Sequence, residues 1–133
     1  MILDLEGRRA VVTGGSRGLG YGIAQALHDS GAEVIITGRT GKVREAAAEI
    51  GSSGPPAYGV TGDISRQQQR ETVCEQILEI YNGRVDILVN AAGTLNRCAA
   101  FEVTQEDWNE VVELNLNAVF FMSKIICRFM AAR

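Results

Sequence analysis

Short apolar runs alternate with segments of helical periodicity along the chain. The apolar runs predict strands at residues 8–13, 33–37, 57–61 and 84–90. Segments with apolar residues three and four positions apart predict helices at 18–30, 43–50, about 65–81 and from about 105 onward. Continuous apolar strands separated by helices are typical of a parallel sheet that is covered on both faces. The pattern therefore predicts an α/β domain with a doubly wound parallel sheet in three layers.

Residues with capping preferences mark the predicted helix ends. Gly31 is expected to close the first helix, and Ser65 is expected to cap the third. Thr104 and Asp107 have the spacing of a capping box, which would open the last helix. One stripe of the first helix is expected to pack on the sheet, and it consists of Leu19, Ile23, Ala26 and Leu27.

The composition is that of a soluble domain and excludes several classes of function. The 133 residues fit one domain, and a net charge of −3 offers no basic face to nucleic acid or an anionic membrane. The N-terminus lacks the pattern of a signal peptide, and no charge-free apolar stretch reaches about 18 residues. We therefore expect a cytoplasmic protein without a membrane span. Three cysteines without a CxxC pair and a single histidine, His28, leave little material for a zinc site.

The stretch TGGSRGLG (13–20) joins the first predicted strand to the first predicted helix. Free N–H groups and the positive dipole end of a helix favour a phosphate at such a place. Gly14 would permit the sharp turn, Gly18 a close approach of the backbone to a pyrophosphate, and Gly20 the packing of the helix on the strand. The spacing G-x-x-x-G-x-G is not the general G-x-G-x-x-G fingerprint, and no G-K-[ST] indicates a P-loop. The plain alternative is a tight turn.

Four segments together resemble the motifs of the short-chain dehydrogenase/reductase family, over essentially the whole chain. TGGSRGLG resembles the cofactor loop of that family, T-G-x-x-x-G-x-G. Asp63-Ile64 resembles its aspartate that hydrogen-bonds the adenine amine. NAAG (90–93) resembles its N-N-A-G turn, with Ala91 in place of the second asparagine. Asn115, in ELNLNAVF, resembles its helix asparagine, which perturbs the helix and anchors a proton-relay water.

The resemblance implies a Rossmann-like fold, of which residues 1–133 hold the first four strands and their flanking helices. It implies that a nicotinamide dinucleotide is bound by Gly14, Ser16, Arg17, Gly18, Leu19, Gly20, Asp63, Ile64, Asn90, Ala91, Ala92 and Gly93. Asn115 is the one catalytic residue that it implies within these residues.

Each match also has a plainer interpretation. Asp63 could be a turn residue ahead of Ser65, and NAAG an ordinary exit from a strand. Asn115 could make only a structural hydrogen bond. Helical spacing puts it on the apolar stripe of Trp108, Val111 and Val119, where a buried amide needs partners.

Basic residues near the end of the second strand indicate which dinucleotide is bound. An acid about 20 residues past the glycine loop would bind the ribose hydroxyl of NAD, and none stands there, because Glu33 begins that strand. Arg39 follows the strand and can pair with a 2′-phosphate, and Arg17 can supply a second contact. NADP(H) is therefore favoured over NAD(H), the alternative being that both arginines are solvated loop charges.

The family's proton-transferring pair is missing from these residues. The resemblance implies a tyrosine with a lysine four positions later, and neither Tyr21, Tyr58 nor Tyr81 has one. We therefore expect residues 1–133 to be a coenzyme-binding domain truncated after the helix that follows the fourth strand. The apolar outer strand 84–90 and the last helix, which is apolar around much of its circumference, predict that these residues pair with other chains or aggregate. The last helix commonly forms a subunit interface in the family, so the resemblance implies a homo-oligomer for the complete protein.

The implied activity interconverts a secondary alcohol and a ketone of a small molecule. The segment after residue 92 looks closest to sugar-acid dehydrogenases of the gluconate 5-dehydrogenase and 2-deoxygluconate 3-dehydrogenase kind, with 3-oxoacyl carrier-protein reductases as the main rival. Arg97 could face a substrate carboxylate or be a solvated loop residue. A non-catalytic dinucleotide-binding module is the alternative if 133 residues are the whole protein. The loop spacing disfavours a methyltransferase.

Overall fold

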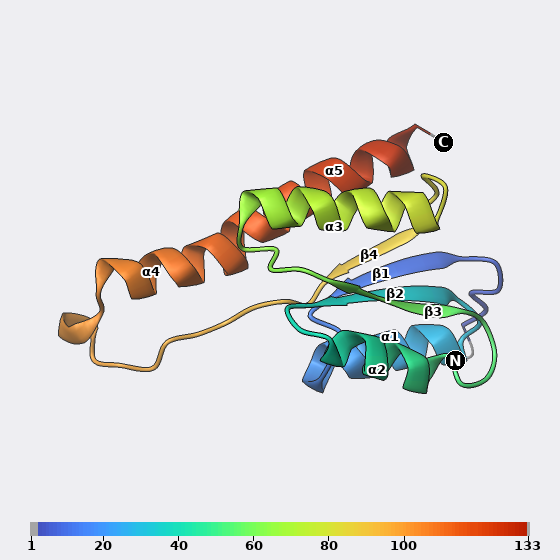
Figure 1. The fold of residues 1–133 in the computed structure, drawn as a ribbon, viewed down its shortest axis with the longest axis horizontal. Coiled ribbons are helices and arrows are strands. Elements are labelled where there is room, and N and C mark those ends of the chain that lie inside the picture. The colour runs from blue at the N-terminus through green and yellow to red at the C-terminus, as the bar shows by residue number, and fades with distance from the viewer. Residues whose placement is uncertain (1–2, 133) are drawn as a thin grey trace.

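The computed structural model describes residues 3–132 and contains one parallel sheet in this range (Figure 1). The strand order is β3-β2-β1-β4, and every neighbouring pair is parallel. The strands are β1 (Arg9–Thr13), β2 (Glu33–Gly38), β3 (Ala57–Thr61) and β4 (Ile87–Asn90). The helices between β1 and β3 lie on one side of the sheet, and the long helices that come after β3 lie on the other side. This confirms the predicted doubly wound α/β fold and places β4 at a sheet edge, as predicted.

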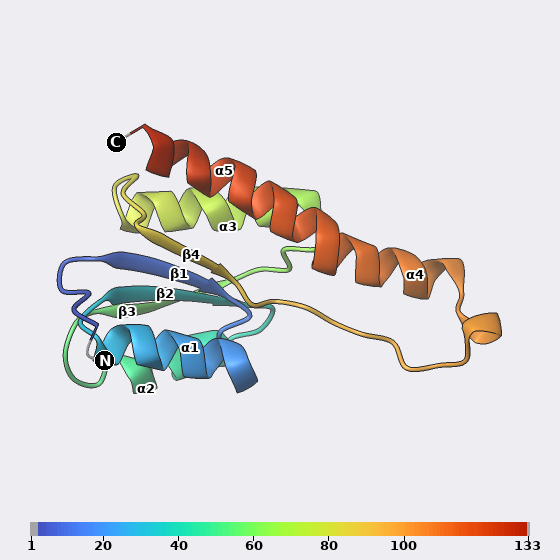
Figure 2. The ribbon, with the colours of Figure 1, turned by 180° about the vertical axis from the view of Figure 1, so that it is seen from behind.

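Two helical layers cover the two faces of the sheet (Figures 1 and 2). One layer consists of α1 (Gly18–Asp29) and α2 (Lys42–Ile50), and the other of α3 (Gln67–Ile80) and α5 (Val119–Ala131). Alternate residues of each central strand point into opposite layers, so Val11 packs with α3 and α5 while Val12 packs with α1 and α2. Because both faces are covered, the central strands are apolar at successive positions.

A long helical arm extends from the body of the domain (Figure 1). After the short η1 (Ala100–Glu102), α4 (Gln105–Val112) runs through the π-helical η2 (Glu113–Ala118) directly into α5. The 27 residues from α4 to α5 are long and apolar enough to cross a membrane by length and composition alone, and 17% of the relevant window is buried. Helices of water-soluble proteins also meet this criterion, so it is weak evidence of a span. Large apolar side chains of the arm are exposed, namely Trp108, Leu116, Phe120 and Phe121.

The buried face of α1 differs from the predicted stripe. The residues that face the sheet are Gly20, Ala24 and His28, whereas Leu19 is 86% exposed. Of the predicted stripe, only Leu27 packs against the core. At Gly20 the helix lies so close to the loop after β1 that a Cβ would collide with the Gly14 carbonyl oxygen, and this contact sets the side of the helix that faces the sheet.

Two helix starts test the predicted caps. Thr104 and Asp107 form the predicted capping box at the start of α4, with hydrogen bonds in both directions. Ser65 does not cap α3, whose N-cap is Arg66. Ser65 lies one position before that N-cap, and its hydroxyl donates to Asp63 Oδ1 at 2.6 Å.

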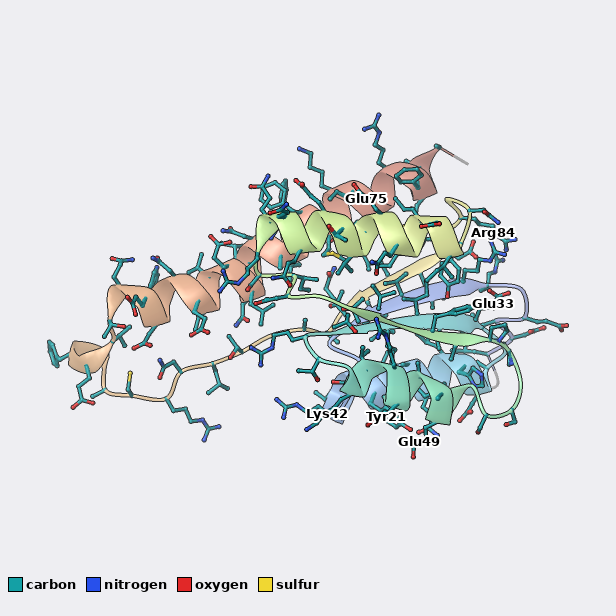
Figure 3. All side chains as sticks on the ribbon, in the orientation of Figure 1. Tyr21, Glu33, Lys42, Glu49, Glu75 and Arg84 are labelled. Carbon is teal, nitrogen blue, oxygen red and sulfur yellow. The ribbon has the colours of Figure 1, made fainter. Side chains whose placement is uncertain are left out.

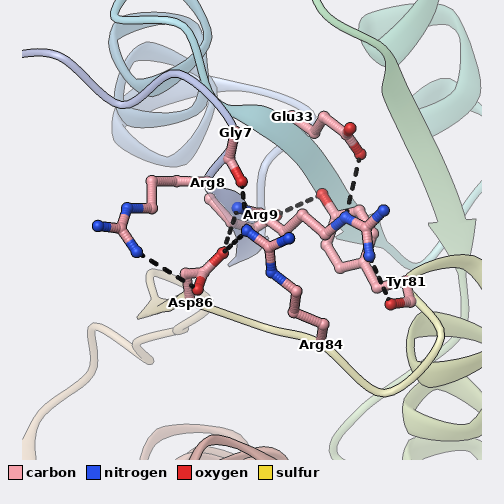
Figure 4. Close-up of polar contacts among 8 residues, drawn as sticks. Gly7, Arg8, Arg9, Glu33, Tyr81, Arg84 and Asp86 are labelled. Atoms are coloured by element: carbon pink, nitrogen blue, oxygen red, sulfur yellow. Dashed lines mark hydrogen bonds and ion pairs between the residues drawn. The ribbon is translucent and has the colours of Figure 1, made fainter. Parts of the chain in front are cut away.

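A polar network lies at the edge of the sheet where the strands begin, and it shortens the fourth strand (Figure 4). The Arg9 N–H donates to Asp86 Oδ2 at 2.9 Å, so a side chain replaces the strand partner at this position. Arg84 reaches both Asp86 and the Gly7 carbonyl. Strand β4 therefore begins at Ile87. The predicted start at residue 84 is wrong.

The three cysteines lie in different environments, and this gives a first prediction. Burial raises the pKa of the Cys74 thiol to about 11, and its Sγ lies 3.5 Å from Met122 Sδ. Cys98 and Cys127 are exposed. Below its raised pKa the Cys74 thiol stays neutral and unreactive, so iodoacetamide at about pH 8 is expected to modify only Cys98 and Cys127. Peptide mass mapping checks this, with guanidinium-unfolded protein as the control in which Cys74 also reacts. Rapid modification of Cys74 in the folded protein would contradict the packing of α3 against α5.

Candidate functional site

The predicted site residues gather at the carboxyl edge of the sheet. Parallel strands end at the same edge, and each strand there is followed by one of the predicted segments. These segments are the glycine loop (14–20) after β1, Arg39 after β2, Asp63-Ile64 after β3, and residues 90–93 at the end of β4. Ligands of open α/β sheets bind outside the carboxyl ends of the strands. The residues are thus grouped where a ligand of such a sheet would bind.

Three glycines shape the loop after β1 in different ways. Gly14 has a φ of +64°, and a Cβ on it would lie 2.8 Å from the Ala92 Cα. A Cβ on Gly20 would collide with the Gly14 carbonyl oxygen. Gly18 has a φ of +60° but faces open space, with nothing within 4 Å of its Cβ position. Gly14 and Gly20 are therefore required by packing, whereas Gly18 leaves room for a ligand.

The amino terminus of α1 is an electropositive end without a cap. Its N-cap residue, Arg17, is extended and makes no side-chain cap hydrogen bond, and the first turn carries no acid. The first N–H groups of a helix have no partner within it. Together with the exposed Arg17 side chain, they suit an anion such as a phosphate. Within residues 3–132, no group of three metal-ligating side chains is found.

The residues at the end of β4 lie against the glycine loop. The Ala92 N–H donates to Thr13 Oγ1 at 3.2 Å, which ties the two segments together. The Asn90 amide donates to Ser123 Oγ on α5 at 3.1 Å. Ala91 packs on the other face of the sheet, against the core that α1 and α2 cover. Residues 90–93 are thus held in place beside the glycine loop by contacts on both faces of the sheet.

Asn115 joins the long helix to the loop that follows β4. Its Oδ1 accepts from the Thr94 N–H at 2.8 Å, and its Nδ2 donates to the Thr94 carbonyl at 2.7 Å. It lies in the π-helical η2, a type of helix perturbation that is frequent at functional sites. The structural hydrogen bond and the perturbed helix are both present, and a role in proton relay stays a prediction.

Asn115 is exposed, so the expected burial of its amide is wrong. Its expected stripe neighbour Trp108 is also 62% exposed. The reason is that this part of the arm projects beyond the sheet and packs on little else (Figure 2).

Asp63 makes local turn contacts at the end of β3. Its Oδ1 accepts from the Ser65 N–H at 3.1 Å and from the Ser65 hydroxyl, and its Oδ2 lies 3.6 Å from Arg66 Nε. The local contacts of the turn interpretation are therefore present, and the contact with adenine stays a prediction. Ile64 is buried, and its carbonyl accepts a hydrogen bond from the buried side chain of Arg70. Arg70 was not among the predicted site residues, although an arginine three residues before Val73 on the buried stripe of α3 is a visible signal in the sequence.

The basic residues lie where β2 ends. Arg39 and Arg17 are both exposed. The two segments are close, because the Ser16 hydroxyl lies 3.6 Å from the position of a Cβ on Gly38. Lys42 lies at the same end of the domain, whereas Glu33 lies at the opposite edge (Figure 3). Glu33, the acid of the second strand, is thus at the end of the strand away from the glycine loop.

Comparison with known proteins identifies the family. The model of the short chain dehydrogenases matches residues 8–133. The chain belongs to this family. It is 34% identical to the 2-dehydro-3-deoxy-D-gluconate 5-dehydrogenase of Bacillus subtilis over 98% of this chain and 50% of that one. It is likewise 34% identical to the gluconate 5-dehydrogenase of Gluconobacter oxydans, over 99% and 52%.

Solved structures of short chain dehydrogenases have the same fold. The 3-oxoacyl (acyl-carrier-protein) reductase from Agrobacterium tumefaciens, solved with NADP bound, superposes with a TM-score of 0.90 at 33% identity, over 99% of this chain and 51% of that one. The chain spans about half the length of the curated relatives it matches. The likeness to short chain dehydrogenases therefore confirms the Rossmann-like fold and the family that the four motifs predicted.

Proposed function

We propose that the chain is the coenzyme-binding part of an NADP(H)-dependent oxidoreductase that interconverts a secondary alcohol and a ketone. The observation that carries this proposal is the start of α1 at the carboxyl edge of the sheet. This helix end has no side-chain cap, and its first residue, Gly18, has a positive φ and faces open space. Membership in the short chain dehydrogenase family supports it.

The described residues fit a dinucleotide in an extended arrangement. The N–H groups from Ser16 to Gly20 would bind the diphosphate, since the helix end and the open face at Gly18 both favour it. Asp63 and Ile64 would hold the adenine, and residues 90–93 would line the path toward the nicotinamide. The bound coenzyme supplies or accepts a hydride. Asn115 would keep the loop at Thr94 in place beside the reacting end.

We propose the 2′-phosphate form because Arg17 is the N-cap residue of α1 and Arg39 follows the end of β2, whereas Glu33 lies at the opposite end of that strand. A guanidinium pairs with a phosphate through two parallel hydrogen bonds. The reductase of Agrobacterium tumefaciens solved with NADP supports this choice.

For the substrate we propose a sugar acid such as gluconate, because two relatives are named as dehydrogenases of such acids. A 3-oxoacyl carrier-protein substrate is the rival, supported by the reductase structure. Arg97 lies in the exposed loop after β4, where it could meet a carboxylate. We further propose that the complete protein is a cytoplasmic homo-oligomer, with the exposed apolar side chains of α4 and α5 covered by another subunit.

The proton-transferring tyrosine and its lysine would belong to residues after position 133, because none of the three tyrosines here is followed by a lysine at the fourth position. The same observation favours a second candidate, a dinucleotide-binding module without catalysis.

Fluorescence titration with NADPH and NADH, followed by turnover assays of the complete protein with gluconate and NADP⁺, tests both candidates. We expect NADPH to bind at least about tenfold more tightly than NADH, with turnover. Binding without turnover of any alcohol or ketone would favour the module, and no binding of either dinucleotide would contradict both.

A further inference from the structure

Arg70 is a buried cation beside the predicted adenine end of the site. It lies near the start of α3, yet it is only 5% exposed and belongs to the same buried face as Val73, Cys74 and Ile77. A charge on a buried face is costly unless other groups satisfy it. A purely apolar side chain would pack there at lower cost, so the guanidinium calls for a specific explanation.

Two groups satisfy the Arg70 side chain. Its Nη1 donates to the Ile64 carbonyl at 3.0 Å, a charge-assisted hydrogen bond. Its guanidinium carbon lies 5.0 Å from the centroid of the Phe121 ring on α5, which is the geometry of a cation–π contact. Among residues 3–132, no ion pair joins it to a carboxylate. Its hydrogen bond to residue 64 is therefore the main directional interaction of the charge.

The same part of α3 holds the preceding residue as well. The Asp63 N–H donates to Gln69 Oε1 at 2.7 Å, one position before Arg70. Two successive side chains of α3 thus fix the backbone of two successive residues at the end of β3. Asp63 and Ile64 are the residues to which the proposed function assigns the adenine.

We propose that Arg70 is a positioning residue for the adenine half of the coenzyme. Its guanidinium fixes the Ile64 carbonyl, and this sets the orientation of the Asp63-Ile64 corner relative to the strand ends. The inference rests on the proposed function, since it assumes that adenine binds at this corner. It differs from a packing role, in which Arg70 would stabilise the contact of α3 with α5 and leave affinity unchanged.

The test compares Arg70→Met and Arg84→Met in the complete protein. Methionine keeps the length and apolar contacts of Arg70 but removes the donor to Ile64. We expect the Kd for NADPH and that for adenosine 2′,5′-bisphosphate, which contains only the adenine half, to rise by the same factor of about ten. Arg84→Met removes the 2.6 Å bond to the Gly7 carbonyl at the opposite edge and should leave both Kd values unchanged. Thermal unfolding of both variants measures any general loss of stability.

Several outcomes would overturn the inference. One is wild-type affinity of Arg70→Met for the bisphosphate, and another is an equal loss of affinity in Arg84→Met. If Arg70→Met does not fold, Arg70→Gln takes its place with the same expectation, because its side chain is shorter than that of arginine and lacks the guanidinium. Failure of the wild-type protein to bind NADPH would instead contradict the proposed function itself.

Discussion

Replacing Gly20 with alanine is expected to weaken NADPH binding by at least about a hundredfold. A Cβ at this position would collide with the carbonyl oxygen of Gly14, which is backbone and cannot rotate away. Gly14 is itself close to Ala92, since a Cβ on Gly14 would lie 2.8 Å from the Ala92 Cα, and this limits how far the loop can move. The start of α1 would have to shift away from β1, and its N–H groups would no longer meet at the diphosphate. Fluorescence titration of the complete variant with NADPH measures this loss.

Gly22→Ala is the matched control for this substitution. It makes the same chemical change two residues later in the same helix, where nothing lies within 4 Å of the Cβ position. We expect unchanged NADPH affinity and a gain in stability of about 0.5 to 1 kcal/mol, because glycine is unfavourable inside a helix. Equal affinities of Gly20→Ala and the wild-type protein would show that the glycine loop does not hold the coenzyme.

Reversing the charge at Arg39 is expected to reverse the preference between the two coenzymes. In Arg39→Asp, a carboxylate would face the 2′-phosphate of NADPH at the end of β2, and the paired guanidinium contact would be lost. We expect NADPH to bind at least about a hundredfold more weakly, while NADH binds as well as before or better, since an acid there can accept from the ribose hydroxyls. The ratio of the two Kd values is the measurement.

Arg128→Asp controls for the change in net charge. Arg128 is exposed near the end of α5, far along the chain from the coenzyme site, and its reversal changes the total charge by the same amount. We expect it to leave the ratio of the Kd values as in the wild-type protein. An unaltered ratio in Arg39→Asp would mean that Arg39 is a solvated loop residue, the alternative that the sequence had left open.

The sequence predicted the layers and the place of the site because both depend on short-range patterns. Apolar strands such as Glu33–Gly38 alternate with helices, and parallel strands bring their carboxyl ends to one edge wherever the intervening helices lie. Motifs that follow successive strands therefore converge without any knowledge of the packing. The capping box at Thr104 was predictable for the same reason, since it involves only residues three apart.

The features that the sequence did not predict depend on contacts between distant segments. The side of α1 that faces the sheet is set by how closely Gly20 approaches the loop, not by where Leu19 would gain most from burial. The shorter β4 follows from the bond between Asp86 and Arg9, 77 positions apart. The exposure of Asn115 follows from the course of the long helix beyond the sheet, which a helical stripe drawn on the sequence cannot show.

A crystal structure of the complete protein with NADPH tests the central claim most directly. We predict electron density for the diphosphate against the N–H groups of residues 16–20, with the 2′-phosphate near Arg39 and the adenine beside Asp63. A coenzyme bound away from the carboxyl edge of the sheet, or at that edge without contact to the start of α1, would contradict it.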